Sequence, residues 1–190
     1  MFKRPLIALL LTSTVLTSGC ATIIGATREE PIQEDTSSRT LGRYLEDEAI
    51  ETKILVNVGK GSQALAQSHV NVVSYNAQVL LIGQVPDENV KREAEAIARQ
   101  TQHVRKVHNE LDIAGPTSTI VRSNDVYLTS RVKVQMLADE RIAGNRIKVV
   151  TENGVVYLMG LVNRQEADLA VEITRSIVGV RKIVKVFEYI

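Results

Sequence analysis

Cysteine and aromatic residues are scarce in this chain. Its 190 residues include one cysteine, no tryptophan, two phenylalanines and five tyrosines. A single cysteine cannot form a disulfide within the chain, so a disulfide-stapled secreted scaffold is excluded. So few aromatic side chains predict cores built from Val, Ile, Leu and Ala. The apolar run at residues 6–16 is shorter than the roughly 20 residues of a membrane-spanning helix, so it is not predicted to cross a bilayer.

Residue patterns that carry catalysis or metal binding are also missing. His69, His103 and His108 are not spaced as metal ligands, and no Cys–His pattern accompanies them. The sequence has no nucleophile elbow and no glycine-rich loop that would cradle a phosphate. The near-neutral charge of +1, without a basic stripe interleaved with aromatics, argues against nucleic-acid binding. The sequence therefore predicts a protein that binds rather than catalyses, with no cofactor and no metal.

The N-terminal segment predicts export. Lys3 and Arg4 precede the apolar run, and small residues follow it up to Cys20, an arrangement typical of a secretory signal peptide over residues 1–19. Because Cys20 is the only cysteine and stands just past this run, its thiol calls for its own explanation. The alternative is a soluble periplasmic protein that is cleaved nearby and retains Cys20 as a free thiol.

The residues around Cys20 resemble a bacterial lipobox. The segment reads Leu16-Thr17-Ser18-Gly19-Cys20, with Thr17 at the position that the lipobox usually gives to leucine. The resemblance implies that Cys20 is acylated, with palmitate among its fatty acids, and becomes the first residue of the mature chain. Ala21 follows, and by resemblance to enterobacterial lipoproteins the lack of Asp there favours the outer membrane, with the protein facing the periplasm.

The rest of the chain repeats itself. The segment from Asn76 to Val85 matches the one from Asn153 to Val162, and Val104-Arg105-Lys106-Val107 matches Val180-Arg181-Lys182-Ile183. Asp47, Ile50, Lys53 and Ile54 match Asp125, Leu128, Arg131 and Val132 in the same way. We expect an acylated, flexible tether at 20–44, a first domain at 45–114, a linker at 115–122 and a second domain at 123–190.

Each copy has the pattern of a helix, two strands, a second helix and a third strand. Asn153-Gly154 between apolar strands predicts a two-residue hairpin turn, and Asn76-Ala77 marks the same turn in the first copy. Gly83 and Gly160 are expected to end the second strand. Because a helix must cross over to the third strand, we predict an α+β fold: two αββαβ modules, each a three-stranded mixed sheet with two helices on one face.

These repeated residues resemble the BON domain. The shared features are a D-x-x-[IL]-x-x-[KR]-[IV] helix start, the glycine after the second strand, and the late V-R-K-[VI] strand. Two such domains behind a lipobox resemble the dual BON-domain outer-membrane lipoproteins of Gram-negative bacteria. Gly179 fits the glycine usual before the last strand, whereas His103 stands there in the first copy. The resemblance implies αββαβ modules, no catalysis, and support of envelope integrity through phospholipid binding.

The opening helix of the second copy carries the best functional signal. Its core face is expected to be Leu128, Val132 and Met136. A second apolar stripe consists of Tyr127, Val134 and Leu137, with Arg131 and Lys133 on its two flanks. The equivalent positions of the first copy hold Ala49, Val56 and Gly59.

This second stripe predicts contact with a membrane surface. A tyrosine suits the interface of a bilayer, and flanking cations can reach anionic headgroups such as those of phosphatidylglycerol. The charge is −4 over residues 20–114 (10 basic, 14 acidic) but +3 over residues 115–190 (11 basic, 8 acidic), which favours an anionic ligand for the second half.

Two alternatives remain at this point. The stripe can instead pack against the first domain or the linker, because small tandem domains often share an interface. The protein can also act as an adaptor that binds an envelope protein through a sheet edge or through the same helix.

Overall fold

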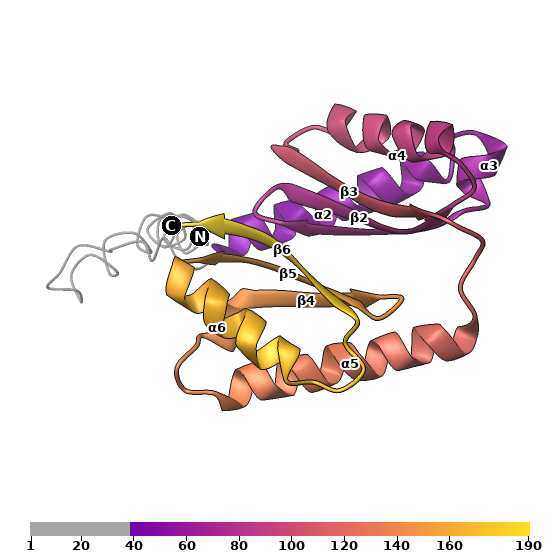
Figure 1. Cartoon of the computed structure of the whole chain (residues 1–190). Helices are drawn as coiled ribbons and strands as arrows, with labels where there is room; N and C mark the ends of the chain where they lie inside the picture. Colours follow the sequence, from indigo (N-terminus) through magenta and orange to yellow (C-terminus); the bar gives the residue numbers. More distant parts are fainter. Residues whose placement is uncertain (1–38) are drawn as a thin grey trace, which may run out of the picture. The chain divides into compact units, whose positions relative to one another are not determined.

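The computed structural model describes residues 39–190, which form two modules with the same order of elements (Figure 1). The first module consists of α2 (Leu41–Val58), α3 (Gln63–Ala66), β1 (His69–Tyr75), β2 (Gln78–Val85), α4 (Glu88–Gln100) and β3 (Lys106–Ile113). The second consists of α5 (Thr119–Ala138), the 3₁₀ turn η1 (Gly144–Arg146), β4 (Ile147–Glu152), β5 (Val155–Val162), α6 (Arg164–Arg175) and β6 (Lys182–Tyr189).

Both sheets have the predicted mixed topology. Strand order is β1-β2-β3 in the first sheet and β4-β5-β6 in the second. In each, the first two strands are antiparallel and the last two are parallel, with α4 or α6 as the crossover. The two long helices of a module pack on the same side of its central strand. The prediction of an α+β fold with two tandem αββαβ modules is therefore confirmed.

The central strands are covered on both faces, which explains their unbroken apolar sequences. In β2, Val79 and Leu81 join the core under the helices, whereas Leu80 and Ile82 point to the opposite side. β5 repeats this arrangement, and all eight residues of β2 are buried. Strands buried on both faces read as continuous hydrophobic runs rather than as an alternation.

Both opening helices begin earlier than the sequence pattern suggested. Thr40 caps α2 by accepting a hydrogen bond from the backbone N–H of Arg43, and Ser118 caps α5 through the N–H of Val121. A side-chain oxygen at this position satisfies an N–H that has no partner within the helix, so the helix starts there. The segments expected as tether (20–44) and linker (115–122) thus include the first residues of α2 and α5.

Each hairpin turn has the left-handed backbone that its sequence predicted. Asn76 and Ala77 have φ of 52° and 62°, and Asn153 and Gly154 have φ of 48° and 72°. The expectation that Gly83 and Gly160 end their strands was inaccurate, because β2 and β5 continue two residues further. A Cβ on Gly83 would lie 2.0 Å from the backbone oxygen of His69, so the close approach of strand β1 requires glycine.

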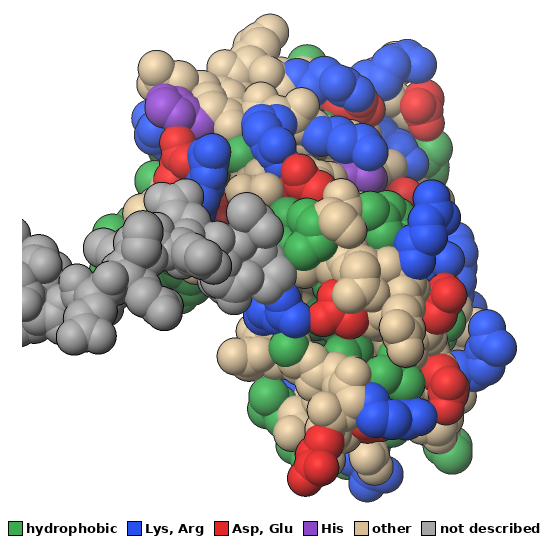
Figure 2. All heavy atoms as spheres, turned by 90° about the vertical axis from the view of Figure 1, so that its left-hand side faces the viewer, with side chains coloured by type: hydrophobic (Ala, Val, Ile, Leu, Met, Phe, Trp, Pro, Cys, Tyr) green, Lys and Arg blue, Asp and Glu red, His purple; other side chains and the backbone are tan. Residues whose placement is uncertain are grey.

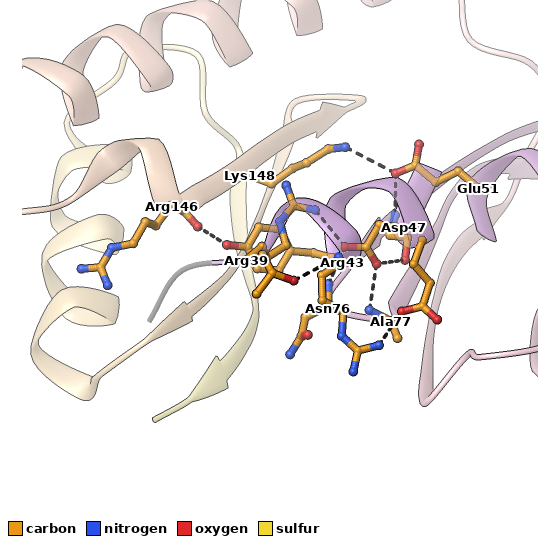
Figure 3. A network of polar contacts seen from close by, with 12 residues as sticks. Arg39, Arg43, Asp47, Glu51, Asn76, Ala77, Arg146 and Lys148 are labelled. Atoms are coloured by element: carbon orange, nitrogen blue, oxygen red, sulfur yellow. Dashed lines mark hydrogen bonds and ion pairs between the residues drawn. The ribbon is translucent and has the colours of Figure 1, made fainter. Parts of the chain in front are cut away.

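The face of each sheet that carries no helix packs against the other module. Val73, Tyr75, Leu80 and Ile82 of the first module form one buried cluster with four residues of the second: Tyr157, Met159, Leu161 and Val186. The Tyr75 hydroxyl donates to the backbone oxygen of Arg146 at 2.7 Å (Figure 3). The two modules therefore meet sheet to sheet, while their helices lie on the outer faces.

Candidate membrane-contact surface

Helix α5 has one face in the core and another in solvent. Leu128, Val132 and Met136 are buried together with Asp125, as the spacing predicted. The Asp125 carboxylate accepts hydrogen bonds from the backbone N–H groups of Asn153 and Gly154, both at 2.8 Å. One edge of the helix is thereby tied to the β4–β5 turn, and its opposite surface is held outward.

The predicted apolar stripe lies on this outward surface. Tyr127, Val134 and Leu137 are 55%, 64% and 62% exposed. Because the two modules meet through their sheets, these side chains are not covered by the first module within residues 39–190. Exposed apolar side chains that gather on one helix face are typical of a surface that contacts a membrane or another protein.

The two flanking cations are also exposed. The guanidinium carbon of Arg131 lies 5.8 Å from the centre of the Tyr127 ring, a cation–π contact that keeps the charge beside the stripe. Lys133 is exposed on the other flank. On the face drawn in Figure 2, basic and acidic side chains are interspersed and form no field of a single sign.

The predicted stripe omitted other exposed apolar residues of α5 and of the segment that follows α6. Val126 and Ile120 on α5 are exposed, and Val178, in the bend between α6 and β6, is 93% exposed. That bend lies against α5, since a Cβ on Gly179 would be 3.1 Å from Leu128. Val178 belongs to no helix or strand, so no periodic signal could have identified it.

The first module presents a different helix surface. At the positions equivalent to the stripe, only Val56 is a large apolar residue, and it is half exposed. Leu41 and Leu45 are exposed at the start of α2. Tyr44 at the same helix end is engaged by the Arg39 guanidinium, which lies 5.3 Å from its ring centre. Leu55 of α2 is 43% exposed as well, so both opening helices carry exposed apolar residues; those of α2 lie toward its two ends, whereas Val126 and Tyr127 lie at the middle of α5.

The histidines take part in ordinary polar contacts. His69 and His103 lie near Glu152 and Glu46, at 3.7 and 2.6 Å, and a ring nitrogen of His108 is 3.1 Å from the Gln78 side chain. Burial lowers the pKa of His108. Within residues 39–190, no three His, Cys, Asp or Glu side chains come together as a metal site.

Two further observations concern the membrane. None of the helices within residues 39–190 is long and apolar enough to cross a bilayer. Cys20 and the predicted signal peptide lie outside the described residues.

Comparisons with known proteins add to these features. A family model described as "BON domain" matches residues 46–115 and 124–190. The chain is 39% identical over 184 residues to "Outer membrane lipoprotein DolP" of Haemophilus influenzae, which covers 97% of this chain and 95% of that protein. It is 34% identical to "21 kDa hemolysin" of Actinobacillus pleuropneumoniae, over 80% of this chain and 78% of that protein. It is 28% identical to "Osmotically-inducible protein Y" of Escherichia coli, over 95% and 92%. None of these names denotes a catalytic activity.

Proposed function

Since this chain belongs to the BON domain family and is an outer-membrane lipoprotein of the cell envelope that faces the periplasm, we propose that it binds anionic phospholipid through helix α5. In this proposal, binding rather than catalysis supports the integrity of the envelope. The observation that carries it is the exposure of Tyr127, Val134 and Leu137 between Arg131 and Lys133.

The proposed contact places α5 in the plane of the membrane interface. The apolar side chains of the stripe would enter the region between headgroups and acyl chains, and the Tyr127 hydroxyl would stay in water. Arg131 and Lys133 would reach phosphate groups such as those of phosphatidylglycerol. Full burial of a Val or Leu side chain stabilises by about 1.5–3 kcal/mol, so a stripe of three partly inserted side chains gives a weak and reversible contact.

An acylated Cys20 would make such a weak contact effective. Each buried CH₂ of an acyl chain contributes about 0.8 kcal/mol, so several chains on one cysteine hold a protein at a bilayer. An anchored protein sees a high local concentration of headgroups, and a low intrinsic affinity then suffices to orient it. We propose residues 1–19 as the signal peptide and the segment after Cys20 as the tether.

Lipid titration tests the role of α5. The soluble fragment that begins after Cys20 would be titrated by NMR with phosphatidylglycerol micelles and, separately, with zwitterionic phosphatidylcholine micelles. We expect shifts on Tyr127, Arg131, Val134 and Leu137 with the anionic lipid alone. Shifts that spare α5, or that are equal with both lipids, would contradict the proposal.

The duplicated sequence supplies a matched control variant. Val134 and Val56 occupy equivalent, exposed positions on α5 and α2. We expect Val134→Ser to weaken co-sedimentation with phosphatidylglycerol vesicles at least threefold, because it removes apolar area from the stripe. Val56→Ser should leave vesicle binding unchanged, and equal losses in both variants would indicate a nonspecific effect.

The anchor has a separate test. Cys20→Ser removes the thiol that would be acylated, so the protein should appear in the soluble periplasmic fraction instead of the outer membrane. Mass spectrometry of the N-terminal peptide should show the acyl mass on the wild type only. A variant that stays in the membrane fraction would show that something other than Cys20 retains the protein.

A further inference from the structure

A groove of about 400 Å³ lies between α6 and β6 of the second module, away from the stripe on α5. Its apolar lining consists of Val171, Val180 and Ile183, and its basic lining consists of Arg175, Arg181, Lys182 and Lys185. No acidic residue lines it. Four positive charges thus surround an apolar floor without a negative charge among them.

These cations have no carboxylate partners. Arg175, Lys182 and Lys185 are exposed, and none of them forms an ion pair within residues 39–190. The Arg181 guanidinium donates to the backbone and side-chain oxygens of Asn153, at 3.2 and 3.3 Å. These neutral acceptors fix Arg181 in position but leave its charge uncompensated.

The equivalent place of the first module carries a carboxylate. The repeat places Glu95 where the second module has Val171, and Asn109 where it has Lys185. Glu95 accepts hydrogen bonds from Arg99 at 2.6 Å and from Asn109 at 3.1 Å, and these bonds to Asn109 and Arg99 lower the pKa of Glu95. The second module has no carboxylate at this place and has a lysine where the first module has Asn109.

The partner of the neighbouring arginine differs between the modules as well. Arg105, the counterpart of Arg181, forms an ion pair with Glu188 across the module interface. Lys106, the counterpart of Lys182, is exposed and unpaired within residues 39–190 as well, so the two sites differ in their arginines, which have carboxylate partners only in the first module. The fold does not require unpaired arginines at this place, because the first module has the same fold with Arg99 and Arg105 paired.

The groove runs along an unpaired strand. β6 pairs with β5 on one side, and within residues 39–190 no strand adjoins its other side. Lysines on an edge strand also serve to discourage aggregation. That role would account for Lys182 and Lys185, but it accounts neither for Arg175 on α6 nor for the apolar floor.

We propose that this groove binds an extended acidic segment of a partner protein, which lies along β6. The segment between residues 180 and 185 spans about 17 Å at ~3.3 Å per residue, and because side chains alternate along a strand, Lys185 shares the helix-side face with Ile183, whereas Lys182 shares the other face with Val184. An added strand would hydrogen-bond to the free edge of β6, and its carboxylates on the helix side would meet the cations that border the apolar lining. A flat bilayer matches protruding side chains better than a recessed floor, which favours a peptide over a lipid surface.

Peptide titration of the full mature protein in nanodiscs of phosphatidylcholine tests this proposal. The probe is a ten-residue peptide of alternating Glu and Val, and its control is a peptide of equal charge with alternating Glu and Pro. Proline lacks the backbone N–H that donates to a neighbouring strand, so we expect the Glu-Pro peptide to bind at least tenfold more weakly than the Glu-Val peptide. Equal binding of both peptides, or binding of neither, would overturn strand addition at β6.

Matched variants locate the site. Val171→Glu with Lys185→Asn recreates the first module's residues, and we expect it to weaken Glu-Val peptide binding at least tenfold. Lys60→Asn removes an exposed positive charge from the first module and should leave the affinity unchanged. An unaltered affinity of the double variant for the Glu-Val peptide would overturn the proposal. Because the peptide experiment contains no anionic lipid, its outcome is independent of the proposed lipid contact of α5.

Discussion

Two aspartates at equivalent positions of the repeat hold the hairpin turn of each module. Asp47 accepts hydrogen bonds from the N–H groups of Ala77 and Asn76, and from Ser74 and Arg39, at 2.7–2.9 Å (Figure 3). Burial alone would raise the pKa of Asp47, but these hydrogen bonds together lower it. The aspartate of the D-x-x-[IL] pattern is thus an ionised acceptor that ties the opening helix to a turn with positive φ.

The aspartates should differ in their contribution to stability. Asp47→Ala removes the acceptor for four donors, and Asp125→Ala removes the acceptor for two. Hydrogen bonds to charged groups contribute about 1.5–3 kcal/mol each but are not additive, so we expect losses of about 4 and about 2 kcal/mol in the free energy of unfolding. Urea denaturation measures both. Glu48→Ala, at an exposed site on α2, is the control, and an equal loss in the two aspartate variants would contradict this account.

The equivalent strand positions Gly83 and Gly160 differ in how strictly they require glycine. Gly83 has φ of +124°, and a Cβ there would meet the His69 oxygen at 2.0 Å. At Gly160 the nearest atom to a Cβ is the Arg146 oxygen at 3.1 Å. We expect Gly83→Ala to destabilise by more than about 3 kcal/mol and Gly160→Ala by about 1 kcal/mol, as thermal unfolding would show. The reverse order would mean that the strand pairing of β1 adjusts easily.

At the scale of elements, the repeat and its hydrophobic spacing predicted most of the fold. The apolar positions of α5 and the turn at Asn153-Gly154 were correct because both depend on local periodicity and backbone preference. The starts of α2 and α5 lie before the first repeated residues, Asp47 and Asp125, because Thr40 and Ser118 are single caps within polar segments. The first residue of each helix depends on one capping hydrogen bond, whereas the presence of the helix depends on the spacing of many residues.

The sequence could not have indicated which charges are compensated. Glu95 pairs with Arg99 four residues away, which spacing suggests, but its bond to Asn109 joins α4 to β3. The basic groove of the second module became visible only when α6 and β6 were placed side by side. The stripe on α5 was predictable because it follows the period of one helix.

Helix α6, which carries Arg175 and Val171 of the groove, begins with a capping box. Asn163 accepts from the N–H of Glu166, and the Glu166 side chain accepts from the N–H of Asn163, both at 2.9 Å. We expect Asn163→Ala to lower the free energy of unfolding by about 1 kcal/mol, since an N–H of the first turn loses its partner. Gln165→Ala in the same turn is an exposed control without this bond. A loss below about 0.3 kcal/mol in urea denaturation would show that the cap is dispensable.

At the scale of the whole described unit, apolar sheet faces join the modules and polar groups border them. Gln84 donates to Glu152 at 2.7 Å, and Lys148 lies 3.4 Å from Glu51. Elsewhere on the interface, Glu188 accepts from Asn76 and Gln78 at 2.9 Å and pairs with Arg105. These contacts border the apolar cluster that joins the two sheets.

Acid should weaken this interface through Glu188. Burial would raise the pKa of Glu188, but hydrogen bonds from Gln78, Asn76 and Arg105 outweigh it and lower the pKa below its usual range. A carboxylate with a lowered folded-state pKa stabilises the folded protein above its unfolded pKa, and this contribution is lost as the pH falls through the folded value. Stability from Glu188 is therefore present at neutral pH and disappears in acid.

Comparison of wild type with Glu188→Gln isolates this effect. At neutral pH the variant should unfold at lower urea, and its two modules should unfold in less coincident transitions, because the ion pair with Arg105 is gone. As the pH falls through the lowered pKa of Glu188, the two midpoints should converge, since the wild-type carboxyl then also loses its charge. Glu172→Gln, on the exposed side of α6, should follow the wild type at each pH. If the difference between wild type and Glu188→Gln persisted in acid, steric or hydrogen-bonding changes rather than the charge of Glu188 would account for the coupling of the modules.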